Sequence, residues 1–448
     1  MEQPKEKVST GRKWAFALGQ TGWCLASFGV TQCLMFFYAA PENGEQLFKT
    51  YIPQRSVGGI FTFIGLVAFL GFFLWAFLDP ITANFSERIK AKTGTRKLLL
   101  WVSIIPAVIF SVLVFFPILS HESKWNVVWV MACILGLYFF ISLYTTSFNA
   151  WINEITTDDA DRLQLVMMMS ITYAVGLGIG YGVYSTMSLL QKTFGGEEAF
   201  KMVILIFGLL SVIFMILPVL FIDDRNHSSG KVGEQVSIAT MMKQVFSEPN
   251  FRVFAFVEML YWFPNTILTI ALPYFVTILL QLDKAYASAI LYAAGIGSFL
   301  LYGWVGKLVK KHGKRRLMLI AFVMSMGSFL FTASLGMYDL NIYAIVVLFV
   351  LINAFPVAVF SILPMDMVGE IAQKDGETTG VYKNAAFYGV KSFMMKIGVS
   401  VTNLVFPSLL LLGKTPEHNF GVRSVALVAV LFSLAGFFVM RRYKDYTN

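Results

Sequence analysis

Charged residues are scarce in this sequence. Asp, Glu, Lys and Arg make up 14% of its 448 residues, whereas apolar residues make up 57% and aromatic residues 16%. Soluble domains carry more charge and less apolar surface than this. The composition therefore excludes an ordinary soluble protein and predicts a chain that needs lipid to cover its surface.

Cysteine and histidine are also scarce, and their positions exclude several kinds of chemistry. The three cysteines each fall within an apolar segment, which predicts buried thiols and no disulfide framework or zinc site. The four histidines all fall in predicted loops: His121, His227, His312 and His418. No apolar segment offers a metal or nucleophile constellation, so we expect no cofactor and place a membrane enzyme last among the functions considered.

Long apolar runs recur along the chain with short polar breaks between them. A membrane-spanning helix needs about 20 apolar residues. Twelve segments meet this requirement: 14–39, 57–79, 97–119, 127–149, 164–190, 201–222, 254–281, 286–308, 316–337, 342–363, 384–411 and 422–440. The first run is longer than the apolar core of about 7–15 residues in a cleaved signal peptide, so we expect it to be retained. The sequence thus predicts an all-α membrane protein.

A polar stretch divides the twelve predicted helices into two groups of six. It is much longer than most of the other breaks, and we expect an N-terminal six-helix bundle over 1–222, a central cytoplasmic loop over 223–250 and a C-terminal six-helix bundle over 251–448. Short basic loops recur after the second and eighth helices, at 93–97 and 310–316. Such an echo is expected of a duplicated bundle, although any short cytoplasmic loop can be basic.

The basic residues are distributed unevenly over the predicted loops. The tails and the even-to-odd loops hold about 25 of the 35 Lys and Arg residues, and the other loops hold about 8. Short loops rich in Lys and Arg stay in the cytoplasm, so both termini are predicted to be cytoplasmic. The net charge of +9 is spread over these loops and forms no single basic face, so we expect no nucleic-acid partner.

Ionisable residues inside the predicted helices are the first candidates for function. Each costs about 2.5–3.5 kcal/mol at a helix centre on the insertion scale. Lys391 and Lys396 lie in the eleventh segment, and Lys396 is too far from either end to reach water easily, so we expect it to have an acidic or polar partner. Asp79 precedes Pro80 and could equally lie at the membrane edge. Glu258 could carry protons or make structural hydrogen bonds.

Polar and aromatic residues at membrane depth are candidates for a solute cavity. Aromatic faces stack on sugar rings, and amides supply both donors and acceptors. Tryptophan is also common at membrane interfaces, which is the simpler explanation for several of the nine tryptophans. The substrate-binding candidates chosen on this basis are Gln20, Trp23, Asn149, Trp262 and Asn265.

Several segments resemble one family. They are 17–20, 79–80 with the loop ending at 94–97, 148–156 with 158 and 161–162, and 363–366, 376–380 and 391–398. Together they resemble the glycoside-pentoside-hexuronide:cation symporters of the major facilitator superfamily, the family of the melibiose permease. The resemblance covers nearly the whole chain in helix order. It implies a major facilitator-type fold with twelve transmembrane helices in two six-helix bundles.

The resemblance also implies roles for individual residues. Asp79 matches the acidic residue near the coupling cation, Ser142 matches a hydroxyl of the cation site, and Lys396 matches a lysine implicated in coupling. Glu258 joins them as a candidate for cation or proton coupling because it is an acid within a helix. Charged residues at or near the resembling segments are candidates for gating or structural roles: Glu87, Arg88, Glu154, Arg162 and Asp366.

The sequence departs from the family pattern at the positions that would set ion and cargo. One turn before Asp79, where sodium-coupled members carry a second Asp, stands Trp75. A lone carboxylate with an indole one turn away is a poor cage for a hard cation, so the coupling ion is left open between H⁺ and Na⁺. Thr21 and Thr145 stand where sugar-binding acids are found, and Ser170 stands near the place of an arginine. Both threonines remain substrate-binding candidates.

These observations predict a secondary active transporter. We expect it to move a small polar solute, a sugar or glycoside, by alternating access with proton or sodium coupling. A lysophospholipid or other amphiphile is the alternative cargo, because the chain is rich in Phe and Met. The expected partners are the solute and the lipid bilayer, and the expected state is a monomer in the inner (plasma) membrane.

Overall fold

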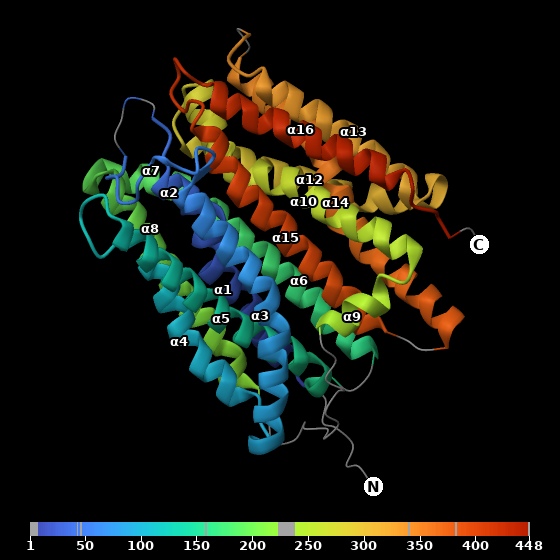
Figure 1. The fold of residues 1–448 in the computed structure, drawn as a ribbon. Helices are drawn as coiled ribbons and strands as arrows, with labels where there is room; N and C mark the ends of the chain where they lie inside the picture. Colours follow the sequence, from blue (N-terminus) through green and yellow to red (C-terminus); the bar gives the residue numbers. More distant parts are fainter. Residues whose placement is uncertain are drawn as a thin grey trace. The chain divides into compact units, whose positions relative to one another are not determined.

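The computed structural model describes residues 8–42, 44, 47–156, 159–222, 238–338, 341–380 and 383–446. Nearly all of the regular structure in these residues is helical (Figure 1). Helices satisfy their backbone hydrogen bonds internally, which is what a chain in lipid requires. The only strands among the described residues are β1 (Ser56–Val57) and β2 (Phe61–Thr62), which pair antiparallel with Ser56 opposite Thr62.

The chain forms two compact units. Unit 1 consists of Met1–Tyr38, Leu47–Pro53 and Phe77–Gln235, and unit 2 of Ala39–Gln46, Gln54–Ala76 and Val236–Asn448. Helix α3 (Phe63–Thr93) therefore begins in unit 2 and ends in unit 1. The predicted boundaries at 222 and 251 remain a prediction, and most of the central polar stretch lies outside the described residues.

Unit 1 is built around its first helix, α1. Besides the end of α3, its elements are α1 (Thr10–Phe28), the π-helical turn η1 (Gly29–Cys33), α2 (Leu34–Tyr38), α4 (Lys97–Leu113), α5 (Lys124–Ile155), α6 (Asp159–Tyr181), α7 (Val183–Phe194) and α8 (Gly196–Phe221). Helix α1 packs against α6 and α8, and α4 packs against α5 and α8. The α1–α8 contact is close: a Cβ on Gly22 would lie 2.6 Å from the backbone nitrogen of Met215, so only glycine fits there.

The core of unit 2 lies mainly between α10, α13, α14 and α15. Its helices are α9 (Ile238–Val245), α10 (Pro249–Ile270), α11 (Leu272–Tyr274), the π-helical turn η2 (Phe275–Leu279), α12 (Ala285–His312), α13 (Lys314–Ala333), α14 (Ile342–Thr379), α15 (Asn384–Leu410) and α16 (Phe420–Met440). Helix α10 packs against α15 and α16, and α13 packs against α14 and α16. Aromatic rings fill the core; Tyr261, for example, stacks on Phe360 with ring centroids 5.0 Å apart.

Ten helical runs in the described part of the chain are long and apolar enough to cross a membrane. Helix α4 is apolar but has only 17 residues. The first predicted span is divided by η1, so it does not form one uninterrupted α-helix. The all-α membrane fold is confirmed, whereas the exact number of twelve spans stays a prediction.

Several predicted helix ends are wrong, and two of them concern site residues. The second span was predicted to begin at 57, but residues 57 and 61–62 lie in β1 and β2, and α3 begins at Phe63. The second span was predicted to end at 79, but α3 continues to Thr93, so Asp79 and Pro80 lie inside it. Proline inside a membrane helix is tolerated where neighbouring groups satisfy the freed carbonyl, and residues 86–92 include good helix formers. The tenth span was predicted to end at 363, but α14 continues to Thr379 and includes Asp366. Amphiphilic helices often extend beyond the hydrocarbon core, which an apolar count does not detect.

Candidate functional site

Asp79 belongs to a cluster of one carboxylate and several hydroxyl groups between α3 and α5 of unit 1. Ser142 donates a hydrogen bond to Asp79 Oδ1 at 2.5 Å, and the hydroxyl oxygens of Ser142 and Thr82 are 2.8 Å apart. Thr82 and Ser142 are buried, and Asp79 is half-buried. Thr82 lies one helical turn after Asp79, which places both side chains toward α5. The cluster can hold a proton or contribute a few oxygen ligands to a cation.

The predicted substrate residues of α1 fall into two groups. Trp23 and Gln20 are half-buried, and the Trp23 indole nitrogen donates to Gln20 Oε1 at 3.1 Å. The Trp23 ring lies beside that of Tyr173 from α6, with centroids 5.6 Å apart. Thr21 is fully buried, and its hydroxyl donates to the Thr172 carbonyl at 2.6 Å, so it is engaged in the α1–α6 contact. Trp23 and Gln20 therefore offer the more accessible polar and aromatic surface.

The two predicted substrate residues of α5 differ in exposure. Thr145 is half-buried, and its hydroxyl donates to the Ser142 carbonyl at 3.3 Å. Asn149 is exposed in the described structure. Thr145 thus lies one helical turn after Ser142 on α5. Asn149 lies one turn further, where the helix surface is exposed.

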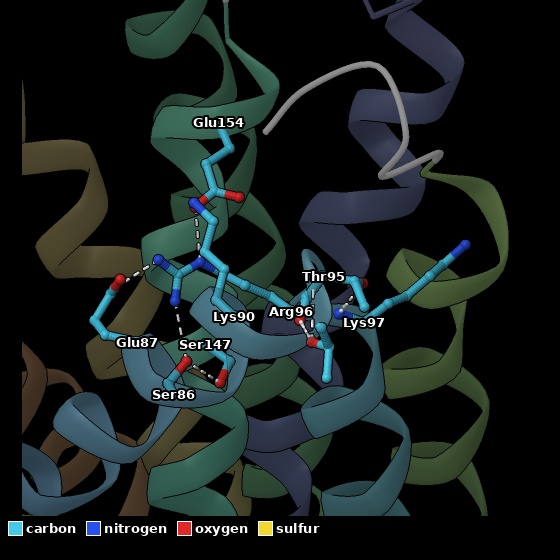
Figure 2. A network of polar contacts seen from close by, with 9 residues as sticks. Ser86, Glu87, Lys90, Thr95, Arg96, Lys97, Ser147 and Glu154 are labelled. Carbon is cyan, nitrogen blue, oxygen red and sulfur yellow. Dashed lines mark hydrogen bonds and ion pairs between the residues drawn. The ribbon is translucent and has the colours of Figure 1, made fainter. Parts of the chain in front are cut away.

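Glu154 and Glu87 belong to a buried ionic network that also contains a residue missed by the predictions. Arg96 is at its centre: its Nε donates to Glu154 at 2.8 Å, its Nη2 donates to Glu87 at 2.5 Å and its Nη1 donates to Ser86 at 3.0 Å (Figure 2). Lys90 also pairs with Glu154. The Arg96 and Glu154 side chains are only 4% and 7% exposed. We call these five residues the Arg96 network.

The Arg96 network connects three helices of unit 1. Arg96 precedes α4, Glu87 and Lys90 lie on α3, and Glu154 lies at the end of α5. Ser147 of α5 extends the network, because its hydroxyl lies 2.8 Å from that of Ser86 (Figure 2). Two cations and two carboxylates balance their charge, which offsets the cost of burying Arg96 and Glu154, while Glu87 is 24% exposed. The sequence signal for Arg96 was its place in the basic loop of the resembling segment.

Arg88 and Arg162, predicted to act in gating, are exposed. The residue before Arg162 is the one that is buried: Asp161 forms an ion pair with Lys13 of α1, and Lys13 Nζ donates to Gln164 at 2.8 Å. Lys13 and Asp161 are almost completely buried. This ion pair ties the start of α1 to the start of α6. Arg162 itself is exposed, and its gating or structural role stays a prediction.

Glu258 lies in unit 2 and is bound by three donors. Its Oε1 accepts from Lys391 Nζ at 2.8 Å, from Tyr261 Oη at 3.2 Å and from Trp262 Nε1 at 3.1 Å. Glu258 is fully buried on α10, and Lys391 comes from α15. Glu258 is thus the acidic partner of Lys391. The acidic or polar partner expected for Lys396 stays a prediction. Both lysines are in the same predicted span, and spacing alone does not determine which one meets α10.

Lys396 lies instead against an aromatic ring. Its Nζ is 4.1 Å from the ring centroid of Trp75, close enough for a cation–π interaction. Both residues belong to unit 2, because the first part of α3 packs with α15. An indole face stabilises an ammonium group without adding a negative charge. Trp75 therefore contributes an aromatic contact to the surroundings of Lys396.

Asp366 of unit 2 borders an open cavity of about 680 Å³, which also contacts Lys314, Glu370, Gln373 and Tyr388. Lys314, at the start of α13, pairs with Asp366 and Glu370, each at 2.7 Å. Burial and the nearby carboxylate of Glu370 raise the pKa of Tyr443, which follows α16. We call Lys314, Asp366 and Glu370 the Lys314 cluster.

Asn265, the last predicted substrate residue, is half-buried on α10.

The geometry defines a class of protein. Long apolar helices hold buried ion pairs and half-buried polar side chains, which is the construction of a multi-pass membrane protein that handles polar solutes. Within the described residues, no group of three or more His, Cys, Asp or Glu side chains could hold a metal ion. Buried charges of this kind mark solute or ion pathways in membrane proteins.

Comparison with known proteins gives the family. The chain belongs to the family described as MFS/sugar transport protein, whose profile matches residues 16–444. The resemblance noted from the motifs is thereby confirmed at the level of this family. The chain is a secondary solute transporter and not an enzyme. Transporters of this superfamily generally need no cofactor.

Solved structures confirm the fold. The nucleoside transporter NupG is similar, with a TM-score of 0.65 at 14% identity, over 97% of this chain and 100% of that one. A D-xylose-proton symporter is similar with a TM-score of 0.62 at 14% identity, over 96% of each chain. A bacterial homolog of the human lysosomal transporter Spinster has a TM-score of 0.61 at 13% identity, over 96% of each chain. No curated protein sequence matches the chain significantly.

Proposed function

We propose that this transporter moves a sugar or glycoside by alternating access. The observation that carries the proposal is the pairing of Trp23 with Gln20 on α1. A half-buried indole beside a second ring, Tyr173, offers an apolar face for a sugar ring, and the Gln20 amide offers hydrogen bonds to hydroxyl groups. Trp262 and Asn265, both half-buried on α10, offer the same combination in unit 2. Family membership and the D-xylose-proton symporter among the similar structures support this cargo.

We propose that the coupling ion is a proton. Asp79 has the hydroxyl groups of Ser142 and Thr82 beside it, and four residues earlier on the same helix stands Trp75. A hard cation prefers several oxygen ligands, so a lone carboxylate with two hydroxyls suits a proton better. Lys396, Glu258 and Asp79 are the proposed coupling residues, and the Arg96 network and Asp366 are proposed to stabilise conformational states.

We further propose that the protein acts as a monomer in the plasma membrane with both termini in the cytoplasm. The excess of Lys and Arg on one set of loops supports this orientation. Basic loop residues near Arg96 and Lys314 belong to that set.

The cargo proposal is tested by uptake into proteoliposomes. We expect the purified protein to exchange labelled sugars or glycosides across the membrane, and Trp23→Ala to raise the apparent KM about tenfold, which corresponds to about 1.4 kcal/mol of lost stacking and packing. Trp125→Ala is the matched control, because Trp125 is 68% exposed at the start of α5. Transport of lysophospholipid or nucleosides with no transport of any sugar would overturn the proposed cargo.

The coupling proposal needs a second measurement on the same vesicles. We expect an imposed pH gradient, and not a sodium gradient, to drive accumulation, and Asp79→Asn to abolish the drive. Accumulation driven by sodium alone would contradict a proton as the coupling ion, and uptake insensitive to both gradients would indicate a uniporter.

A further inference from the structure

The hydrogen bonds of Glu258 are unequally shared between its two carboxylate oxygens. Lys391, Tyr261 and Trp262 all donate to Oε1. Oε2 is buried and accepts no hydrogen bond from any described residue. An ionised carboxylate has about four acceptor sites over its two oxygens. One oxygen of Glu258 is therefore fully used, and the other is buried and unsatisfied.

The unsatisfied oxygen is unfavourable while Glu258 is ionised. Leaving a buried acceptor without a partner costs about 1–3 kcal/mol, and more when the group is charged. A proton that binds to Oε2 removes the charge and leaves Oε1 as a carbonyl oxygen that still accepts its donors. The three donors thus stabilise the negative charge at Oε1 only, and Oε2 is the oxygen that can bind a proton.

The surroundings of Glu258 contain little other charge. Lys391 is the charged side chain that faces it from α15, and Tyr261 is the titratable group on its own helix. Helix α14 presents the ring of Phe360, which stacks on Tyr261, and α16 meets α10 through the stacked rings of Phe432 and Phe263. Protonation of Glu258 would therefore change the balance of charge at this place from zero to +1.

We propose that Glu258 and Lys391 form a proton-operated link between α10 and α15. A hydronium ion transfers a proton to Oε2 and leaves as water, the carboxylate becomes a neutral acid, and the Lys391 ammonium loses its counter-ion. This inference rests on the proposed function, because it supplies unit 2 with the residue pair at which a coupling proton acts.

The link lies where α10 and α15 are in close contact. A Cβ on Gly398 of α15 would lie 2.5 Å from the Met259 carbonyl oxygen of α10, so the two backbones meet one residue after Glu258. A buried ammonium without a counter-ion is costly, so neutral Glu258 favours a state in which Lys391 reaches water or a polar group of the solute. Gain and loss of one proton then shifts the two helices between conformations.

Infrared difference spectroscopy tests the proton site without any need for a known solute. We expect the protein in lipid nanodiscs to show a protonated-carboxyl band that grows as the pH falls, is lost in Glu258→Gln and is retained in Glu258→Asp. Glu154→Gln is the matched control, because Glu154 is also buried but pairs with both Lys90 and Arg96, and its loss should leave the band in place. A band that persists in Glu258→Gln, or is absent from the unmodified protein at every pH, would overturn the proposal.

The role of Lys391 has its own test. Removal of the ammonium takes away the charge that favours ionised Glu258, so in Lys391→Gln the carboxyl band should persist to more alkaline pH. An unchanged pH dependence of this band in Lys391→Gln would mean that Lys391 does not govern the protonation of Glu258, which would contradict the link.

Transport measurements then separate this inference from the proposed function. In Glu258→Gln we expect uptake to lose its acceleration by a pH gradient, while solute exchange at equal pH continues. Continued acceleration by the gradient in this variant would overturn the role of Glu258 in coupling. If no sugar or glycoside is transported by the unmodified protein, the proposed cargo fails, and the infrared measurements still decide whether Glu258 is the proton site.

Discussion

The two units use ionic clusters of similar design but different burial. In unit 1, Arg96 precedes the helix α4 and pairs with Glu154 at the end of α5; in unit 2, Lys314 begins α13 and pairs with Glu370 late in α14. Both cations belong to the basic loops that recur in the sequence. In the Arg96 network the two paired side chains are almost completely buried, whereas Lys314, Glu370 and Asp366 are 18%, 28% and 56% exposed.

The difference in burial indicates which of the two clusters is the more rigid. Arginine presents a planar fork that donates to three partners at once, and burial protects these bonds from water and salt. Lysine is a point charge, and the Lys314 cluster lies beside an open cavity with two carboxylates for one cation. We infer that the Arg96 network is the rigid member of the pair and the Lys314 cluster the adaptable one.

The largest expected loss of stability comes from removal of the Arg96 guanidinium group. Arg96→Ala leaves Glu154 with Lys90 and strips Glu87 and Ser86 of their charged donor, and breaking a buried pair in this way costs about 3–5 kcal/mol. We expect a marked fall in the thermal unfolding midpoint in detergent. A variant as stable as the unmodified protein would remove the basis of the comparison.

A smaller loss of stability is expected when the positive charge is kept but the planar guanidinium group is replaced. Arg96→Lys preserves the cation near Glu154 but cannot donate to Glu87 and Ser86 at the same time. Its unfolding midpoint should lie between those of the unmodified protein and Arg96→Ala. Equal midpoints for the two variants would mean that bidentate geometry carries all of the stabilisation, and full rescue by lysine would mean that charge alone suffices.

The smallest effect is expected in unit 2. Lys314→Ala breaks a partly exposed cluster, and such pairs contribute about 0.2–1 kcal/mol, so the midpoint should change little and the change should shrink further in high salt. Glu377→Gln is the control for a more exposed pair, since the side chains of Lys374 and Glu377 on α14 are 44% and 43% exposed, and no measurable change is expected. A loss of stability in Lys314→Ala as large as in Arg96→Ala would refute the contrast between the clusters.

Asp79, Glu258 and Lys396 became candidates because burying a charge in lipid needs a reason. Ser142 was chosen through the family resemblance, and the structure brings Asp79 and Ser142 into one cluster. Their partners could not be predicted with the same success. Thr82 and Arg96 supply close contacts, yet each looks like an ordinary helix or loop residue until a neighbouring helix is placed beside it. Lys391 stood out as a charge inside a span, but the sequence did not show which acid it meets.

Helix ends show the same limit. An apolar count ends a helix where the lipid ends, but backbone hydrogen bonding continues through polar residues, so α3 runs 14 residues beyond Asp79 to Thr93. This extension places Glu87 and Lys90 on the same rigid helix as Asp79. The Arg96 network depends on it, because Glu87 must reach Arg96 and Lys90 must reach Glu154 of α5.

The sequence by itself determined that the chain is a helical membrane transporter, because apolar length, scarcity of charge and the family segments are properties of consecutive residues. The tertiary structure decided which buried charges meet: Lys391 with Glu258, Lys396 with the ring of Trp75, and Arg96 with two carboxylates. The physical reason is that burial makes a partner obligatory, while the choice of partner depends on which helix faces pack together.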